Sequence, residues 1–339
     1  MPISPSAALL PCAELHLHIE GTLEPELIFE LAARNGIDLP YADLEELRAR
    51  YQFTDLQSFL DLYYSNMEVL RTEADFAAMT RAYLRRAAAA GVRHVEMMVD
   101  PQAHLLRGVP LEECINGVAG VLATSLEEFG ISTVLIAAFL RDRPIAEAED
   151  VLAQLLAMDA PIAAIGLDSA EVGNPPEGFV ELYRMARAAG LKCVAHAGEE
   201  GPAHYVEQAL DLLKADRIDH GIRALDDPAL VERLVRDRVP LTVCPLSNVR
   251  LRAVDTLADH PLPQMLALGL NISVNSDDPA YFDGYVDDNF AALQRTFGLS
   301  PDQLQELAVN SVESSFASGE RRAELLELIR AWRAAQGVS

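Results

Sequence analysis

Short runs of β-branched and other apolar residues alternate along this chain with longer amphipathic segments. Eight such runs recur, at residues 13–19, 92–99, 132–139, 162–168, 192–196, 217–220, 241–244 and 271–275. Several are apolar at nearly every position, which is typical of strands buried on both faces. One amphipathic segment separates each later run from the next, as at residues 202–215 and 228–238. The pattern predicts parallel βα units.

Eight repeated βα units predict an α/β fold of the (β/α)8 TIM-barrel type. The alternative is a doubly wound open sheet. That fold is disfavoured because no glycine-rich phosphate-binding turn follows the first predicted strand.

Two segments exceed a minimal barrel. About 70 residues separate the first two strands, far more than an ordinary connection, and they contain a predicted helix from Pro25 to just before Gly36 and amphipathic segments at 44–51 and 56–70. An insertion after the first strand lies at the catalytic end of a barrel, so residues of about 20–90 are expected to cover the site. The alternative is a surface insertion without a role, since loops tolerate growth.

The second segment is the C-terminal region. Ser300-Pro301-Asp302-Gln303 reads as a capping box with proline at the first helical position. Additional helices are therefore predicted to about Ala334. No repeat or interdomain linker interrupts the chain, so residues 1–339 are expected to form a single domain.

Composition narrows the choice of partners. A net charge of −25 argues against a nucleic-acid ligand and against an anionic lipid surface. Solubility alone explains such acidity best, and a neutral or cationic small-molecule substrate would fit it better than a polyanion. The four cysteines have no paired spacing, as expected of reduced thiols in a cytoplasmic protein. Residues 1–11 do not resemble a signal peptide, and no apolar run has the length of a membrane span. The sequence does not fix an oligomeric state.

The first predicted strand carries the strongest chemical signal, the segment ELHLHIEG at residues 14–21. Side chains alternate faces along a strand, so His16 and His18 point to the same side, about 7 Å apart. Two imidazoles at the carboxyl end of a barrel strand favour a metal site. A single histidine there would more often be a core residue bonded to a carbonyl group.

Three further polar clusters follow predicted strands: HAGEEG at 196–201, IDHG at 218–221 and VNSDDP at 274–279. Each alone reads as a turn or a helix start. Together they collect histidines and carboxylates at the end of the barrel where active sites are built.

Physical roles follow from the residue types. His16, His18, His196 and Asp277 form a set of three nitrogens and one oxygen that suits one zinc ion and leaves a position for water; iron accepts the same donors. Zinc lowers the pKa of bound water toward neutrality.

Three other residues are candidates for work on the substrate. His220 is expected to orient the water and accept its proton. Glu199 would protonate a heteroatom of the substrate if burial raises its pKa, and Asp278 would hold the substrate by a hydrogen bond. The remaining histidines, His94, His104, His204 and His260, are expected to be structural or exposed.

These motifs resemble the adenosine and adenine deaminase family, a mononuclear branch of the metal-dependent amidohydrolases. The resemblance rests on HLHIEGTLEPE, HAGEEGP, RIDHGIR, TVCPLSNVRL and VNSDDPAYF. It implies zinc at the four ligands named above, Glu199 as proton donor to a purine ring nitrogen, His220 beside the attacking water and Asp278 at the purine N7 edge. It also implies a backbone amide after the fourth strand that holds another ring nitrogen. Ser169 matches that position, where adenosine deaminases carry glycine.

The resemblance is greatest to the adenine deaminase branch, which implies conversion of adenine to hypoxanthine and ammonia in purine salvage. Glu20 stands where adenosine deaminases usually carry an aspartate that contacts the sugar, and its extra methylene would crowd a ribose. Discrimination by one methylene is worth only about 1–3 kcal/mol. Deamination of adenosine or of N6-substituted adenines therefore stays open, as does a non-catalytic purine-binding relative. One departure is Asp283, where the family pattern leads us to expect glycine.

A dinuclear centre is the nearest chemical rival. It normally needs a bridging group, often a modified lysine, at the end of the fourth strand. The only lysines of the chain are Lys192 and Lys214, and neither stands there. One metal ion per chain is therefore expected.

Overall fold

The computed structural model describes residues 10–336. All eight predicted strands are present, with ends that differ from the prediction by two residues at most. They are β1 (Cys12–His18), β2 (Val92–Val99), β3 (Ser132–Leu140), β4 (Ala164–Asp168), β5 (Lys192–Ala197), β6 (Arg217–His220), β7 (Pro240–Val243) and β8 (Asn271–Val274). The strands are parallel and pair in chain order. The predicted (β/α)8 barrel is confirmed.

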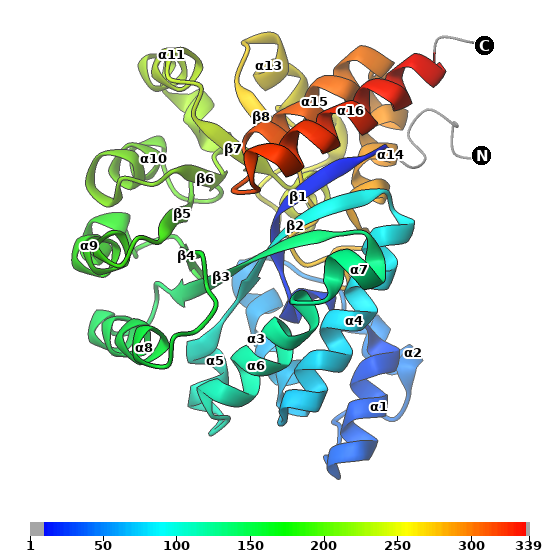
Figure 1. Ribbon diagram of the computed structural model, residues 1–339, viewed down its shortest axis with the longest axis vertical. Helices are drawn as coiled ribbons and strands as arrows, with labels where there is room; N and C mark the ends of the chain where they lie inside the picture. The colour runs from blue at the N-terminus through cyan, green and yellow to red at the C-terminus, as the bar shows by residue number, and fades with distance from the viewer. Residues whose placement is uncertain (1–9, 337–339) are drawn as a thin grey trace.

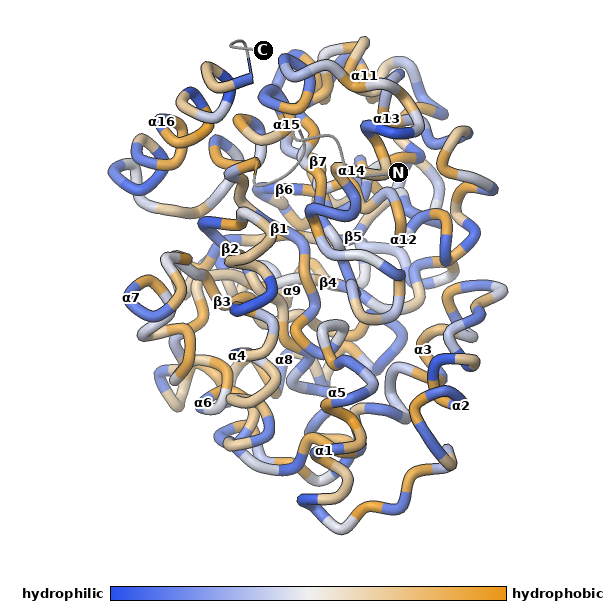
Figure 2. Tube along the Cα trace, turned by 90° about the vertical axis from the view of Figure 1, so that its right-hand side faces the viewer, coloured by the Kyte–Doolittle hydropathy of each residue, from blue (hydrophilic) through white to orange (hydrophobic). Residues whose placement is uncertain are grey.

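Helices surround the strands on the outside (Figure 1). Those between β2 and β8 are α5 (Pro101–Leu106), α6 (Leu111–Leu122), α7 (Ser125–Phe129), α8 (Ile145–Ala157), α9 (Val180–Ala188), α10 (Ala203–Gln208), the π-helical η4 (Ala209–Leu213), α11 (Pro228–Arg236), α12 (Pro245–Arg250) and α13 (Leu262–Ala267). In Figure 2 hydrophilic and hydrophobic stretches alternate along outer helices such as α11 and α16. This is the pattern of helices with one face on the barrel and one face in water.

The connection between β1 and β2 is helical, as predicted. It holds α1 (Pro25–Asn35), α2 (Leu44–Ala49), α3 (Leu56–Asn66), the short η2 (Met67–Val69) and α4 (Glu73–Ala89). Proline starts α1, and Gly36 ends it in the left-handed region at φ 65°.

After β8 the chain forms α14 (Val286–Phe297), α15 (Pro301–Glu313) and α16 (Gly319–Gln336). The predicted capping box is present, because the hydroxyl of Ser300 accepts a hydrogen bond from the amide of Gln303. None of the described helices has the length and apolarity needed to cross a membrane. The expectation for residues 1–11 falls largely outside the described residues, and the single-domain assignment of residues 1–339 stays a prediction.

The seam between the first and last strands is closed by the residues that follow β8. The amide of His18 donates to the carbonyl oxygen of Asp277 at 3.0 Å, and the amide of Asp277 donates to the carbonyl oxygen of His16 at 3.2 Å. The backbone of one predicted metal ligand therefore joins the strand that carries two others.

Candidate active site

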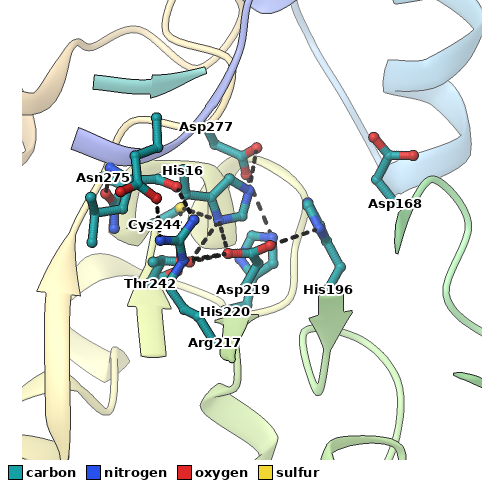
Figure 3. Close-up of polar contacts among 12 residues, drawn as sticks. His16, Asp168, His196, Arg217, Asp219, His220, Thr242, Cys244, Asn275 and Asp277 are labelled. Atoms are coloured by element: carbon teal, nitrogen blue, oxygen red, sulfur yellow. Dashed lines mark hydrogen bonds and ion pairs between the residues drawn. The ribbon is translucent and has the colours of Figure 1, made fainter. Parts of the chain in front are cut away.

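Four of the predicted residues converge on one point at the carboxyl end of the barrel. His16 and His18 come from β1, His196 from β5, and Asp277 lies just beyond β8. All four are buried, and their potential ligand atoms lie within 4.8 Å of one another. His16 Nε2 is 3.3 Å from Asp277 Oδ1, and His18 Nε2 is 3.2 Å from His196 Nε2. Figure 3 shows His16, His196 and Asp277 turned toward the same space.

This cage fits a metal ion by its chemistry and by its unmet hydrogen bonding. His16 Nε2 is buried, faces the cage and has no hydrogen-bond partner within the described chain. A buried polar atom without a partner is costly, and a cation supplies what is missing. Three imidazole nitrogens and one carboxylate oxygen are the donors of a catalytic zinc or iron site.

A second layer of polar groups orients the cage. The hydroxyl of Thr242 lies 3.1 Å from His16 Nδ1 and donates to Asp219 Oδ1 at 2.8 Å. Asp219 Oδ2 in turn lies 3.6 Å from His196 Nδ1. The hydroxyl of Ser247 donates to Asp277 Oδ2 at 2.7 Å. Contacts of this kind fix the imidazole rings with Nε2 toward the cage.

Glu199 and His220 lie beside the cage. Glu199 Oε2 is 3.5 Å from His220 Nε2, which is 3.7 Å from Asp277 Oδ2. The amide of Asn248 donates to Glu199 Oε1 at 3.2 Å. Burial, reinforced by the charge of Asp277, raises the pKa of Glu199 well above its usual range. Burial and the neighbouring imidazole of His16 lower the pKa of His220 to about 3. These shifts favour the protonated form of Glu199 and the neutral form of His220.

The loop that carries Glu199 is held by one buried carboxylate. Glu171, in the turn after β4, accepts hydrogen bonds from four successive backbone amides, of Gly198 at 2.6 Å, Glu199 at 3.0 Å, Glu200 at 3.0 Å and Gly201 at 2.8 Å. A β-carbon at Gly201 would lie 2.6 Å from the same carboxylate, so only glycine fits. Glu171 thus fixes the position of the predicted acid.

Three predicted site residues have left-handed backbones. The φ angles of Ser169, His220 and Asp277 are 69°, 65° and 66°. Non-glycine residues seldom adopt this region, and strained positions cluster at functional sites. The angle also explains why glycine is typical at the position of Ser169. Asp283 stands at the other position where glycine is expected, and its φ of 59° explains that expectation in the same way.

A small cavity of about 40 Å³ opens beside the cage and is covered by α3. The hydroxyls of Tyr64 and Ser169 lie 3.4 Å apart, which joins α3 to the turn after β4. The lining residues are His18, Leu56, Phe59, Leu60, Tyr63, Tyr64, Asp100, Asp168, Ser169, His196, Glu199, His220, Leu251, Asp277 and Asp278.

The predicted substrate-binding residues occupy different places. Asp278 and Ser169 line the cavity, and Asp278 Oδ1 is buried without a hydrogen-bond partner in the described chain. Glu20 is not among the lining residues. Its carboxylate accepts from the amide of Asp100 at 3.1 Å and lies 2.6 Å from His104 Nε2. Direct contact of Glu20 with a substrate stays a prediction, and the structure places it behind Asp100.

Two buried acids of the cavity were missed by the sequence reasoning. Asp100 directly follows β2 and Asp168 ends β4, the same kind of position that identified the other site residues. A search for polar residues at the end of every predicted strand, and not only for those close to a histidine, would have identified both acids. Figure 3 shows Asp168 apart from the network around His16, with no dashed line to the residues drawn.

The remaining histidines lie outside the candidate metal cages of the described residues. His94 lies 2.8 Å from the hydroxyl of Ser132, and His260 lies 3.2 Å from Asn248 Oδ1. His204 is exposed. His104 contacts Glu20, as described above. All four occupy the structural or exposed positions expected for them.

A parallel eight-stranded barrel with an imidazole and carboxylate cage at the carboxyl ends of its strands defines the class of metal-dependent amidohydrolases. Comparison with known proteins agrees with this class. The model of the adenosine deaminase family matches residues 11–332. The chain belongs to the adenosine deaminase family.

The similar proteins include two adenine deaminases. One, from Streptomyces coelicolor, is 60% identical over 326 residues, which cover 96% of each chain. The crystal structure of the other, from Arthrobacter aurescens, is 68% identical with a TM-score of 0.95, over 95% of this chain and 98% of that one. A third relative, an amidohydrolase from Burkholderia ambifaria solved with bound Zn, is 29% identical with a TM-score of 0.88, over 99% of this chain and 96% of that one.

Proposed function

We propose that this protein hydrolyses adenine to hypoxanthine and ammonia with one zinc ion per chain. The observation that carries the proposal is the meeting of a four-ligand cage with Glu199 and His220 in one buried cavity. The names of its full-length relatives support adenine as the substrate.

The residues around the cage divide the proton transfers between them. Bound at His16, His18, His196 and Asp277, the metal would lower the pKa of water and so supply a nucleophile at neutral pH. His220, neutral and buried, accepts the proton of the attacking water. Glu199 donates its proton to the ring nitrogen next to the amino-bearing carbon. His220 then gives its proton to the amino group, ammonia leaves as the carbonyl forms, and the hydroxyl proton returns to Glu199, so that adenine and water become hypoxanthine and ammonia.

The rest of the cavity positions the base. Burial and the charge of Asp277 raise the pKa of Asp278 well above its usual range, and its carboxyl O–H donates to N7 of the purine. Ser169 directly follows β4 and has a left-handed backbone, and its amide is offered to another ring nitrogen. Two fixed contacts and the cage define one orientation of a planar ring, which places the amino group at the reacting end.

Zinc is favoured over iron by the zinc found in the Burkholderia ambifaria relative and by the nitrogen and oxygen donors of the cage. Metal analysis of purified protein tests this part of the proposal. We expect one equivalent of zinc per chain. Two equivalents, or iron in the active form, would contradict it.

Ultraviolet spectroscopy of adenine with purified holoprotein, with ammonia assayed in parallel, tests the reaction itself. We expect hypoxanthine and ammonia in equal amounts. Adenosine and N6-methyladenine serve as comparison substrates, and adenosine turned over more efficiently than adenine would defeat the choice of substrate. No turnover of any purine would identify a binding protein instead. A role in purine salvage and a cytoplasmic location stay predictions.

A further inference from the structure

Asp100 and Asp168 form a part of the cavity that the reaction above does not use. His18 separates them from the cage: its Nε2 lies 3.6 Å from Asp277 Oδ1, whereas its Nδ1 lies 3.5 Å from Asp168 Oδ2 and 3.8 Å from Asp100 Oδ1. The two acids therefore lie one imidazole ring beyond the metal ligands. Both line the cavity, and each is only 2% exposed.

The oxygens of these acids lack the donors that buried carboxylates require. Apart from a side-chain hydrogen bond between the two acids themselves, both oxygens of Asp168 and one of Asp100 have no hydrogen-bond partner in the described chain. No lysine or arginine forms an ion pair with either acid among the described residues. A buried acceptor without a donor is costly, and native proteins seldom retain one without a function. The cavity side of the pair is thus built to receive N–H groups from a ligand.

The wall behind the pair is fixed. The amide of Asp100 donates to Glu20 Oε1 at 3.1 Å, and Glu20 is held by His104 at 2.6 Å. On the cavity side, Tyr64 of α3 meets Ser169, the neighbour of Asp168, at 3.4 Å. A substituent on the ligand at this point would meet packed groups on both sides.

We propose that Asp100 and Asp168 select a free purine base over its nucleoside by accepting the ring N–H of the imidazole half of adenine. This inference rests on the proposed function. With the amino-bearing carbon at the cage and N7 accepting from the carboxyl group of Asp278, adenine carries its single ring N–H at N9. In adenosine that donor is replaced by a bond to the sugar, which removes the hydrogen bond and leaves the acids buried without a partner.

The chemistry of the pair predicts strong rejection of substituted bases. Sites built to hydrogen-bond an N–H or O–H group of the substrate reject analogues that lack it by about 10⁴-fold or more. The methylene argument for Glu20 gives a far smaller factor. Glu20 would act through the position of Asp100, not by contact with the sugar.

The test compares adenine with 9-methyladenine and adenosine in steady state, using native holoenzyme and a matched pair of variants. Asp168→Asn keeps an acceptor oxygen of similar bulk, whereas Asp168→Leu removes it. For the native enzyme we expect kcat/KM for adenine to exceed that for 9-methyladenine by about 10⁴-fold. Asp168→Leu should reduce this ratio at least tenfold through a loss on adenine, and Asp168→Asn should retain most of it.

Metal content and product binding separate selection from a merely structural role. We expect all variants to retain their metal, and native protein to bind hypoxanthine but not 9-methylhypoxanthine in calorimetry, with the difference reduced in Asp168→Leu. Asp150→Asn, an exposed change on α8, is the charge control. Equal losses on both substrates together with metal loss would show that Asp168 only orients His18, and would overturn the inference.

The outcomes distinguish this inference from the proposed function. If native enzyme deaminates adenine and 9-methyladenine equally well, the selection by Asp100 and Asp168 is wrong while the deaminase assignment stands. If it deaminates neither but binds hypoxanthine, the assignment itself is wrong. The comparison of substrates on native protein needs no variant, so it holds even if Asp168→Leu fails to fold.

Discussion

Buried charge is treated differently in two regions of the barrel. Glu96 of β2 accepts a hydrogen bond at 2.5 Å from Nη1 of Arg217, the first residue of β6. It also lies 3.3 Å from His94 Nε2 and accepts from the amide of Phe316. Each of its oxygens has a partner. At the carboxyl ends of the strands, Asp168 has no hydrogen-bond partner except the neighbouring acid Asp100, and His16 Nε2 has none within the described chain.

The pKa values reflect this difference. Burial would raise the pKa of Glu96, but the charge of Arg217 outweighs it and lowers the pKa. Burial and the charge of Asp100 together raise the pKa of Asp168 well above its usual range. The charges around Glu96 and Arg217 pair with each other and stabilise the fold. The groups at the carboxyl ends of the strands stay available to bind a metal and a ligand. Partnering, more than burial, separates structural from functional charge in this barrel.

The largest effect should come from removing the metal, which breaks the functional region and spares the other. Thorough chelation is expected to abolish adenine turnover, and one equivalent of zinc should restore it. The far-ultraviolet circular dichroism should change little, because the strands are held by their own ladder and core. Chelated protein that still turns over adenine would contradict the role of the cage.

Glu199→Gln should follow, with a fall in kcat of about 10²–10⁴-fold, the usual contribution of a general acid. The metal content should not change, because Glu199 is outside the four-ligand set. Glu200→Gln in the same loop is the matched control and should keep most of the activity. Unaltered turnover in Glu199→Gln would remove its assignment as the acid.

Glu96→Gln tests the structural region. It leaves Arg217 buried without its main counter-charge, so the free energy of unfolding should fall by about 3–5 kcal/mol in urea titrations. The kcat/KM of the folded enzyme should stay near the native value. Because the folded pKa of Glu96 is lowered, its contribution is present above the unfolded pKa and is lost as pH falls through the folded value. Native stability should therefore decline with acidification more than that of Glu96→Gln.

The smallest effect concerns the pH profile. The groups that face Glu199 are Asp277, Glu171, Glu200, His220 and Asn248, and the charges of the three acids raise its pKa. Activity that needs protonated Glu199 falls as pH rises through this pKa. Glu200→Gln removes one charge, so the basic limb of kcat/KM should move to lower pH by a fraction of a unit. Glu232→Gln, exposed on α11, should leave the limb in place, and an unmoved limb in Glu200→Gln would refute the coupling.

The sequence predicted the barrel well because its strands are buried on both faces and leave continuous apolar runs. The cage was equally accessible, since histidines and carboxylates at strand ends have few structural explanations when four clusters coincide. Their convergence follows from the topology, which brings the carboxyl ends of β1, β5 and β8 together.

What the sequence did not predict depends on partners far away in the chain. Glu171 matters because four amides of residues 198–201 point at it, and nothing near Glu171 in sequence announces them. Asp100 and Asp168 matter because of the donors they lack. Glu20 was interpreted from the length of its own side chain, whereas in the structure its carboxylate contacts His104 and the amide of Asp100.

The hydrogen bonds between Asp277 and the β1 backbone have a mechanical consequence. The first and last strands of the barrel are joined through the backbone of Asp277, and the side chain of Asp277 also belongs to the cage. A cation bound at the cage would therefore strengthen the contact between β1 and the segment that follows β8. Amide hydrogens of His18 and Asp277 should then exchange with solvent more slowly in loaded protein than in chelated protein, so that cofactor loading becomes readable as the tightness of a closure.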